Sequence, residues 1–146
     1  MNRAEIIPSI VLSGYALGRI AAQDAGNEAP AAQWRVLNLL EQQGGTRVGA
    51  LAAAARTTQP GMTRLLGTLE RDDLIVREQD PADSRAVVVR ITERGSAALA
   101  AWRAEFREVL APRFADLDTE EWKTLERAAA ILAAHTALAD RKGEHE

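Results

Sequence analysis

The stretch TTQPGMTRLLGTLERDDLIVREQDPADSRAVVVRITERG, residues 57–95, decides the fold of this chain. It begins as a helix, because Thr57 or Thr58 can serve as the N-cap and Pro60 falls in the first turn, where its missing N–H costs nothing. Apolar residues then recur at helical spacing and give this helix a buried side. Gly61 and Gly67 are poor helix residues, and they indicate a close approach to another surface.

A β-hairpin follows this helix. The runs LIVREQ, residues 74–79, and AVVVRI, residues 86–91, are rich in β-branched residues and flank a six-residue polar tip that opens with Asp80-Pro81. Thr92 then stands where the N-cap of a further helix is expected. The stretch therefore predicts a helix, a hairpin and a second helix in direct succession.

Helices are also predicted before this stretch. Residues 4–23 carry apolar residues at a spacing near 3.6, and the loop-forming run DAGNEAP, residues 24–30, ends that helix. A second helix follows and stops at Gly44-Gly45. Thr46 can cap a short third helix, RVGALAAAAR.

The C-terminal part is predicted to be helical too. Pro112 should kink or break the long helix that starts after Thr92. Asp118 and Glu121 have the spacing of a capping box and open a last helix over residues 119–139.

Composition excludes several classes of protein. With 146 residues and nearly half of them apolar, the chain has the size of one domain with a real core. It has no cysteine, which removes disulfides, thiolate nucleophiles and cysteine-based metal sites, and its two histidines, His135 and His145, are spaced too far apart for a helical metal site. We expect no metal and no cofactor. No apolar run is expected to be long enough to cross a membrane, and the N-terminus lacks the pattern of a signal peptide, so a cytoplasmic location is predicted.

The charge is distributed unevenly. Residues 46–94 hold eight arginines and seven acidic residues, a balance of +1, whereas the other residues hold ten bases and fourteen acids, a balance of −4. The central region is therefore no broad basic patch, and binding to nucleic acid would depend on individually placed arginines.

Two short helices joined by a tight turn and followed by a hairpin form a winged helix-turn-helix. Its second helix can enter the major groove of DNA, and the hairpin can reach the backbone or the adjacent minor groove. An arginine at the hairpin tip suits a narrow, electronegative minor groove, and an aspartate two residues away can hold its guanidinium in a bidentate pair. Asp83 and Arg85 have this arrangement.

Residues 57–95 closely resemble the core of MarR-type transcriptional regulators. The resemblance rests on Thr-Arg-Leu in the recognition helix, on Asp-Pro-x-Asp-x-Arg in the wing and on Thr-Glu-x-Gly at the start of the next helix. It implies one MarR-type unit over residues 1–146, mainly α with a small β-hairpin wing. Residues 30–94 would form the winged-helix DNA-binding region, and residues 4–23 and 95–140 the N- and C-terminal dimerisation helices.

The resemblance also implies DNA-binding residues. The recognition helix would run from about Thr58 to Asp72, and the contacts to double-stranded DNA would come from Thr58, Gln59, Pro60, Gly61, Thr63, Arg64, Arg77, Asp83, Ser84 and Arg85. Two of these regions depart from the family pattern. Asp73 replaces the usual glycine after the helix, so the helix is expected to end differently, and Ser84 replaces a common second arginine of the wing.

Family members of this type are dimers. The winged-helix region, residues 30–94, is here called the head. The helices outside the head carry more apolar surface than the head can cover, which independently favours a homodimer. Its two recognition helices would read a pseudo-palindromic operator near the regulated gene, most simply as a repressor. The family often binds small aromatic or phenolic effectors, and Tyr15, Arg19 and Trp34 lie on elements that could line such a pocket, although a core or interface role is the simpler reading of Trp34.

Two other classes of function were compared with this one. An enzyme needs converging acid-base groups, whereas the adjacent acids Asp72-Asp73 and Glu120-Glu121 point about 100° apart on a helix, so catalysis is rejected. A dimeric adaptor whose winged helix binds a protein partner stays open, because the head is barely basic.

Overall fold

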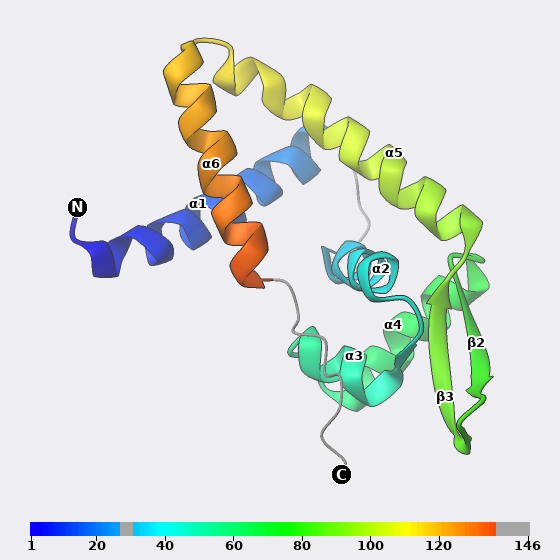
Figure 1. Ribbon diagram of the computed structural model, residues 1–146. Helices are drawn as coiled ribbons and strands as arrows, with labels where there is room; N and C mark the ends of the chain where they lie inside the picture. The colour runs from blue at the N-terminus through cyan, green and yellow to red at the C-terminus, as the bar shows by residue number, and fades with distance from the viewer. Residues whose placement is uncertain (27–30, 137–146) are drawn as a thin grey trace. The chain divides into compact units, whose positions relative to one another are not determined.

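The computed structural model describes residues 1–26 and 31–136 (Figure 1). Its elements are α1 (Arg3–Asp24), α2 (Ala31–Gln43), β1 (Thr46–Arg47), α3 (Val48–Ala54), α4 (Gln59–Arg71), β2 (Ile75–Asp80), β3 (Asp83–Ile91), α5 (Glu93–Leu110), a 3-10 turn (Ala111–Phe114) and α6 (Thr119–Thr136). The predicted fold class, mainly helical with a small β wing, is confirmed. Residue 30 and residues 137–140 of the predicted regions, and His145, lie outside the described residues.

The chain consists of two compact units, residues 1–110 and residues 111–146. The first unit holds the helix-turn-helix, the sheet, α1 and α5. Within it, α5 continues from the end of β3 and contacts both α1 and α2 (Figure 1). The second unit holds the 3-10 turn and α6, with Phe114 and Trp122 in tilted aromatic contact at a centroid distance of 6.4 Å.

One apolar cluster organises the head. It draws side chains from α2, α3, α4, β2, β3 and α5, and its fully buried members include Leu37, Leu40, Leu51, Leu66, Leu69, Ile75, Val89 and Leu99. Each such side chain contributes about 1.5–3 kcal/mol through its removal from water. Because these residues come from every major element of the head, the recognition helix, the hairpin and α5 are held as one folding unit.

The sheet has three strands in the order β1-β3-β2, all antiparallel. The short strand β1 was not predicted, because two residues carry no recognisable β pattern. The hairpin tip also differs from the prediction: β2 and β3 extend to Asp80 and Asp83, so only Pro81 and Ala82 connect them, not six residues. A register irregularity between Gln79 and Asp80 accommodates this tight connection.

Most predicted helix ends are confirmed by their hydrogen bonds. The Thr58 hydroxyl caps α4, and Asp118 and Glu121 exchange bonds between side chain and main chain at 2.8 and 2.9 Å before α6. The long helix stops at Leu110, just ahead of Pro112, as predicted. The predicted cap of α3 is wrong: Arg47 takes the N-cap position without a capping bond, and the Thr46 hydroxyl donates to the Gly44 carbonyl instead.

The first helix corrects the prediction that no apolar run could span a membrane. Helix α1 has 22 residues and a mean hydropathy of 1.2 in its most apolar window, which is enough by length and composition. It begins with a capping box formed by Asn2 and Glu5, and it leaves Leu12 and Tyr15 exposed at 69% and 70%. Length and composition do not distinguish a membrane span from an apolar helix that another protein surface covers.

The recognition helix, the hairpin and α5 meet at one joint. The Thr92 hydroxyl donates to the Asp73 carbonyl at 2.6 Å and accepts the Gly95 N–H at 2.9 Å, while the Thr92 N–H donates to the Leu74 carbonyl at 3.0 Å. A Cβ on Gly95 would collide with the Leu74 carbonyl oxygen. Close approach at this joint therefore requires glycine at position 95.

The two glycines of α4 behave differently from each other. A Cβ on Gly61 would meet Thr57 and Thr58 side-chain atoms at 3.1 Å, whereas a Cβ on Gly67 would meet nothing within 4 Å. Gly61 is therefore close to another part of the chain, but only to the turn that precedes α4. No contact within the described head explains Gly67.

These contacts predict opposite effects for two glycine-to-alanine changes. Gly67→Ala should raise the free energy of unfolding by about 1 kcal/mol, because alanine favours a helix interior and has room there. Gly95→Ala should lower it by about 3 kcal/mol or more, because the new Cβ collides with main chain. Urea denaturation of the two variants checks both signs. A destabilised Gly67→Ala protein would mean that position 67 packs against something outside the head.

Candidate nucleic-acid interface

The start of α4 is capped and exposed. The Thr58 hydroxyl accepts the Gly61 N–H at 3.2 Å, and Pro60 occupies the first turn. Gln59 and Pro60 are exposed. Pro60 has no N–H and the cap takes the Gly61 N–H, so the positive end of the helix dipole is the main feature of this terminus that favours phosphate.

Opposite faces of α4 have opposite chemistry. Met62, Leu66 and Leu69 are fully buried in the head, whereas Thr63 and Arg64 are exposed. Since these residues share one helix, burial of the apolar face fixes the direction in which Thr63 and Arg64 project. The sequence-predicted recognition residues thus lie together on the outer face of one helix.

The wing holds Arg85 through its main chain. The Asp83 carboxylate accepts the Arg85 N–H at 3.0 Å, and no Asp83–Arg85 ion pair occurs among the described residues. The expected bidentate pair is therefore wrong in its geometry, because the tight tip turns the Asp83 side chain back onto the backbone. Gln79 also donates to the Ser84 carbonyl at 2.6 Å, which fixes the tip further. The side chain of Arg85 is exposed.

Arg77 has a partner within the protein. Its Nε lies 2.6 Å from a carboxylate oxygen of Glu70, so the ion pair ties β2 to the end of α4. Arg90 pairs with Glu78 across the hairpin at 3.1 Å, and Arg47 pairs with Asp80 at 2.7 Å. Arginines with protein partners are less available to DNA, so a contact from Arg77 stays a prediction with a competing structural role.

Within the described part of the head, Arg56, Arg64 and Arg85 take part in none of these ion pairs. They come from the turn of the helix-turn-helix, from α4 and from the wing, and Arg64 and Arg85 are exposed. The arrangement matches an interface that depends on a few placed arginines rather than on total charge.

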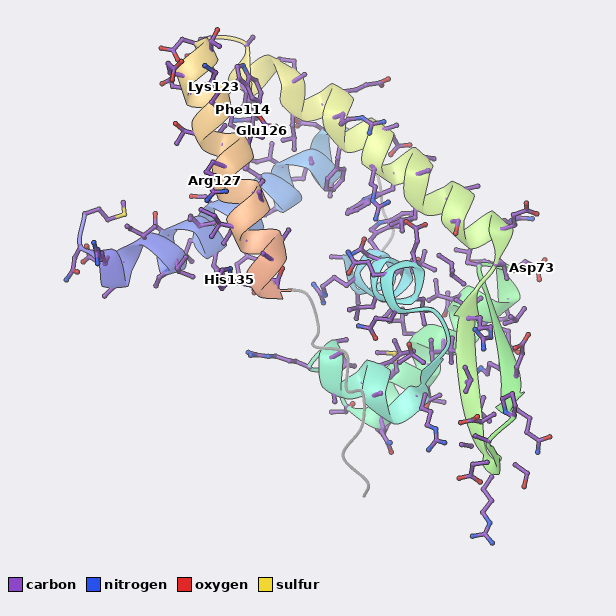
Figure 2. The ribbon with its side chains drawn as sticks, in the orientation of Figure 1. Asp73, Phe114, Lys123, Glu126, Arg127 and His135 are labelled. Carbon is purple, nitrogen blue, oxygen red and sulfur yellow. The ribbon has the colours of Figure 1, made fainter. Side chains whose placement is uncertain are left out.

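Both helices of the helix-turn-helix end in left-handed residues that are not glycine. Arg56 has φ 51° and Asp73 has φ 58°. Each is followed by a residue whose N–H bonds back to the helix, Thr57 to Ala52 and Leu74 to Leu69, both at 2.9 Å, as in a Schellman motif. The expected different ending at Asp73 is therefore wrong, because the usual motif forms with Asp in the glycine position. Figure 2 labels Asp73.

The residues considered for an effector are not brought together by any contact among the described residues. Tyr15 is exposed on α1, and Arg19 lies one turn further along the same helix. Trp34 on α2 instead stacks on Trp102 of α5, with ring centroids 5.1 Å apart, and Trp102 contacts Phe106 at 4.3 Å. The Trp34 Nε1 atom is buried, and no described residue accepts a hydrogen bond from it. Trp34 and Trp102 otherwise pack against the apolar cluster of the head as partly buried residues.

Arg47 and Asp80 were not predicted from the sequence. They lie 33 positions apart, and their hydrogen bonds join the start of α3 to the wing. Arg47 alone could have been noticed, because it precedes α3 at an N-cap position where Ser, Thr, Asp or Asn is favoured. Its partner could not be found without the fold.

Comparisons with known proteins identify the family and the fold. A family model described as "MarR family" matches residues 30–87. The HTH-type transcriptional regulator MT0903.1 of Mycobacterium tuberculosis is 34% identical over 102 residues, which cover 70% of this chain and 71% of the relative. Wild-type MarR from E. coli superposes with a TM-score of 0.72 at 19% identity, covering 90% of this chain and 97% of that one. A point mutant of MepR from S. aureus, solved bound to an oligodeoxyribonucleotide, gives a TM-score of 0.61 at 23% identity over 92% and 98% of the two chains.

The left-handed helix ends predict a gain in stability on substitution. Arg56→Gly should raise the free energy of unfolding by about 1 kcal/mol, because glycine adopts a positive φ without a Cβ clash. Asp73→Gly should gain less, since Asp tolerates this conformation better than Arg. Thermal unfolding provides the measurement, and Ala53→Gly in the right-handed body of α3 is the control that should lose about 1 kcal/mol. If Arg56→Gly lowered the free energy of unfolding as much as the control does, the backbone at Arg56 would not be strained.

Proposed function

Because this chain belongs to the MarR family of transcriptional regulators, we propose that it is a homodimeric repressor of a nearby gene that binds a pseudo-palindromic operator. The observation that carries the proposal is the presence of an exposed Thr63–Arg64 face on α4 and an exposed wing Arg85 in one head with a common apolar core. DNA-binding regulation follows from the family, and so does the exclusion of an enzyme. Repression, the operator and a cytoplasmic location are our proposals.

In this proposal the head reads DNA with two elements. The N-terminal part of α4 enters the major groove, where Thr63 and Arg64 meet base edges and Gln59, Pro60 and Gly61 approach phosphates. The wing then reaches the neighbouring minor groove with Arg85, supported by Asp83 and Ser84. Arg77 contributes at most a phosphate contact, because Glu70 competes for its guanidinium.

A second copy of the chain would cover the apolar helices outside the head. On α1, Leu12 and Tyr15 are exposed, and on α6, Trp122 and Leu125 are 49% and 45% exposed. Polar side chains such as Lys123, Glu126 and Arg127 also lie along α6 (Figure 2). Apolar residues exposed in this number on helices that also carry charge favour a partner surface over open solvent. A two-fold dimer would present two recognition helices to successive turns of DNA.

Loss of single arginines should weaken operator binding. Arg64→Ala and Arg85→Ala should each cost about 1–3 kcal/mol of binding free energy, and Arg64→Ala should also relax sequence preference. Fluorescence anisotropy with a duplex from upstream of the gene, a scrambled duplex and several salt concentrations measures both effects. Sedimentation should show an unchanged dimer.

Arg127→Ala serves as the charge control, because it removes the same charge from α6, outside the proposed DNA-binding region. Since α6 belongs to the proposed dimer surface, sedimentation must show that this variant is still a dimer. Tight binding by Arg85→Ala would remove the wing from the interface. Equal, weak and salt-sensitive binding of both duplexes by the wild-type protein, followed by failure of a genome-wide site selection, would favour the alternative of an adaptor that binds a protein partner.

We further propose a small aromatic or phenolic anion as the effector, with Trp34 as the residue that recognises it and Tyr15 and Arg19 as further lining residues. The support comes from the Trp34 indole N–H, which is buried beside the Trp102 ring and lacks an acceptor. A carboxylate or phenolate would supply that acceptor and could stack on the same rings. Because α2 contacts α5, a ligand bound there would change how these two helices pack. That change would alter the spacing of the two heads in the dimer.

Replacing Trp34 tests this proposal. Titration with 4-hydroxybenzoate should quench tryptophan fluorescence saturably and lower operator affinity in the wild-type protein. Trp34→Phe keeps an aromatic ring but removes the N–H, and it should bind about tenfold more weakly. Trp122→Phe, in the other unit, should titrate like the wild type. Equal affinity of the wild type and Trp34→Phe would remove Trp34 from the effector site.

A further inference from the structure

An ion pair links the wing to the start of the helix-turn-helix. Arg47 donates to a single oxygen of Asp80 from two nitrogens, Nε at 3.0 Å and Nη2 at 2.7 Å. The other oxygen of Asp80 accepts the Ala82 N–H at 2.9 Å. Both oxygens of this carboxylate are therefore used, one by the body of the head and one by the hairpin tip.

Both partners occupy positions that decide the direction of the wing. Asp80 is the last residue of β2 and lies beside the register irregularity, immediately before the two-residue tip. Arg47 belongs to β1, opposite Val88 of β3, and directly precedes α3. A bond between them therefore joins the two outer strands of the sheet, on either side of β3.

The position of Arg47 is unusual for its chemistry. It occupies the N-cap of α3, where a short side chain with an oxygen acceptor is favoured, and it makes no capping bond. Its side chain is directed to the wing instead. Arginine at this N-cap position is explained if its contact with Asp80 stabilises the head more than a capping hydrogen bond would.

Asp80 differs from the other acidic partners of the head. Its side chain is 13% exposed, whereas Glu70 and Glu78 are 49% and 55% exposed in their ion pairs. The Ala82 N–H and then Arg47 hold the pKa of the Asp80 carboxyl below its ordinary value of 3.8. The carboxylate is thus charged at neutral pH. Its contribution to stability is complete above the ordinary pKa and is lost as the pH falls through the lower folded value.

We propose that this contact, here called the Arg47–Asp80 clasp, is a positioning device that holds the wing at a fixed angle to the recognition helix, so that the wing is already ordered when Arg85 meets DNA. The inference rests on the proposed DNA-binding function. A hairpin held at one end only would lose conformational freedom on binding, and the clasp removes that cost beforehand. It also assigns a role to a negative charge that lies close to a DNA-binding tip.

Two carboxylates on the same strand provide a matched test. Asp80→Asn and Glu78→Gln each remove one negative charge and one ion pair from β2, two residues apart. Electrostatics alone predicts that both variants bind the DNA polyanion as tightly as the wild type or more tightly. The clasp predicts that Asp80→Asn binds operator DNA about tenfold more weakly, while Glu78→Gln does not weaken.

The clasp also predicts coupling to the wing arginine. Arg85→Ala should lower affinity much less in the Asp80→Asn background than in the wild type, because Arg85 is no longer held in place. Arg47→Ala should weaken binding like Asp80→Asn. If Asp80→Asn bound as tightly as the wild type or more tightly, or if Glu78→Gln weakened equally, the proposal would be overturned. Weaker binding by Arg47→Ala alone would overturn it too and make Arg47 a direct phosphate contact.

A measurement on the free protein separates this inference from the proposed function. Amide hydrogen exchange at Ala82–Arg85 should become faster in Asp80→Asn, with little change in Tm and unchanged exchange in α4. Unchanged exchange at the tip would overturn the clasp even if the protein binds DNA. A wild-type protein that fails to bind DNA would remove the proposed function, and the exchange experiment would still decide whether the clasp holds the wing.

Discussion

The joint at Thr92 is the contact on which the geometry of the head depends. One hydroxyl links the carbonyl of Asp73, which follows α4, to the N–H of Gly95, in the first turn of α5. The recognition helix, the base of the hairpin and the long helix therefore share a single anchoring point. The absence of a side chain at Gly95 lets α5 approach the Leu74 carbonyl directly. The short, β-branched side chain of Thr92 therefore connects the start of α5 to the end of α4 through hydrogen bonds.

Most ion pairs of the head connect its strands and helices to one another, and the protein has little net charge to attract DNA from a distance. The net charge of the protein is −3, so long-range steering toward DNA is weak. Arg47, Arg77 and Arg90 are engaged with acidic residues that connect strands and helices. Arg64 and Arg85 stand on the outer face of α4 and on the wing. In the proposed complex with DNA, the internal ion pairs would fix the scaffold and the outward arginines would make the contacts.

Features set by neighbouring residues could be predicted from the sequence, and features set by distant ones could not. Thr58 and Thr92 were recognisable as caps because a cap and its helix are adjacent in the chain. The family resemblance correctly indicated the fold class and the order of the elements. The hairpin tip was predicted too long, and Asp83 was given the wrong bond, because both depend on the strand register. The pairing of Arg47 with Asp80 crosses 33 positions and leaves no periodic signal.

Several local rules of helix design are broken around the recognition helix, and α1 breaks one too, because Pro8 lies inside that helix. Arg56 and Asp73 occupy left-handed positions that favour glycine, Gly67 weakens the middle of α4, and Arg47 replaces a capping residue before α3. Helix α6, by contrast, opens with a complete capping box at Asp118. Departures of this kind concentrate where function constrains sequence, since selection for stability alone would remove them. The departures on both sides of α4 are consistent with the proposed function of the helix-turn-helix, and the one in α1 lies on the helix that the proposal assigns to the dimer.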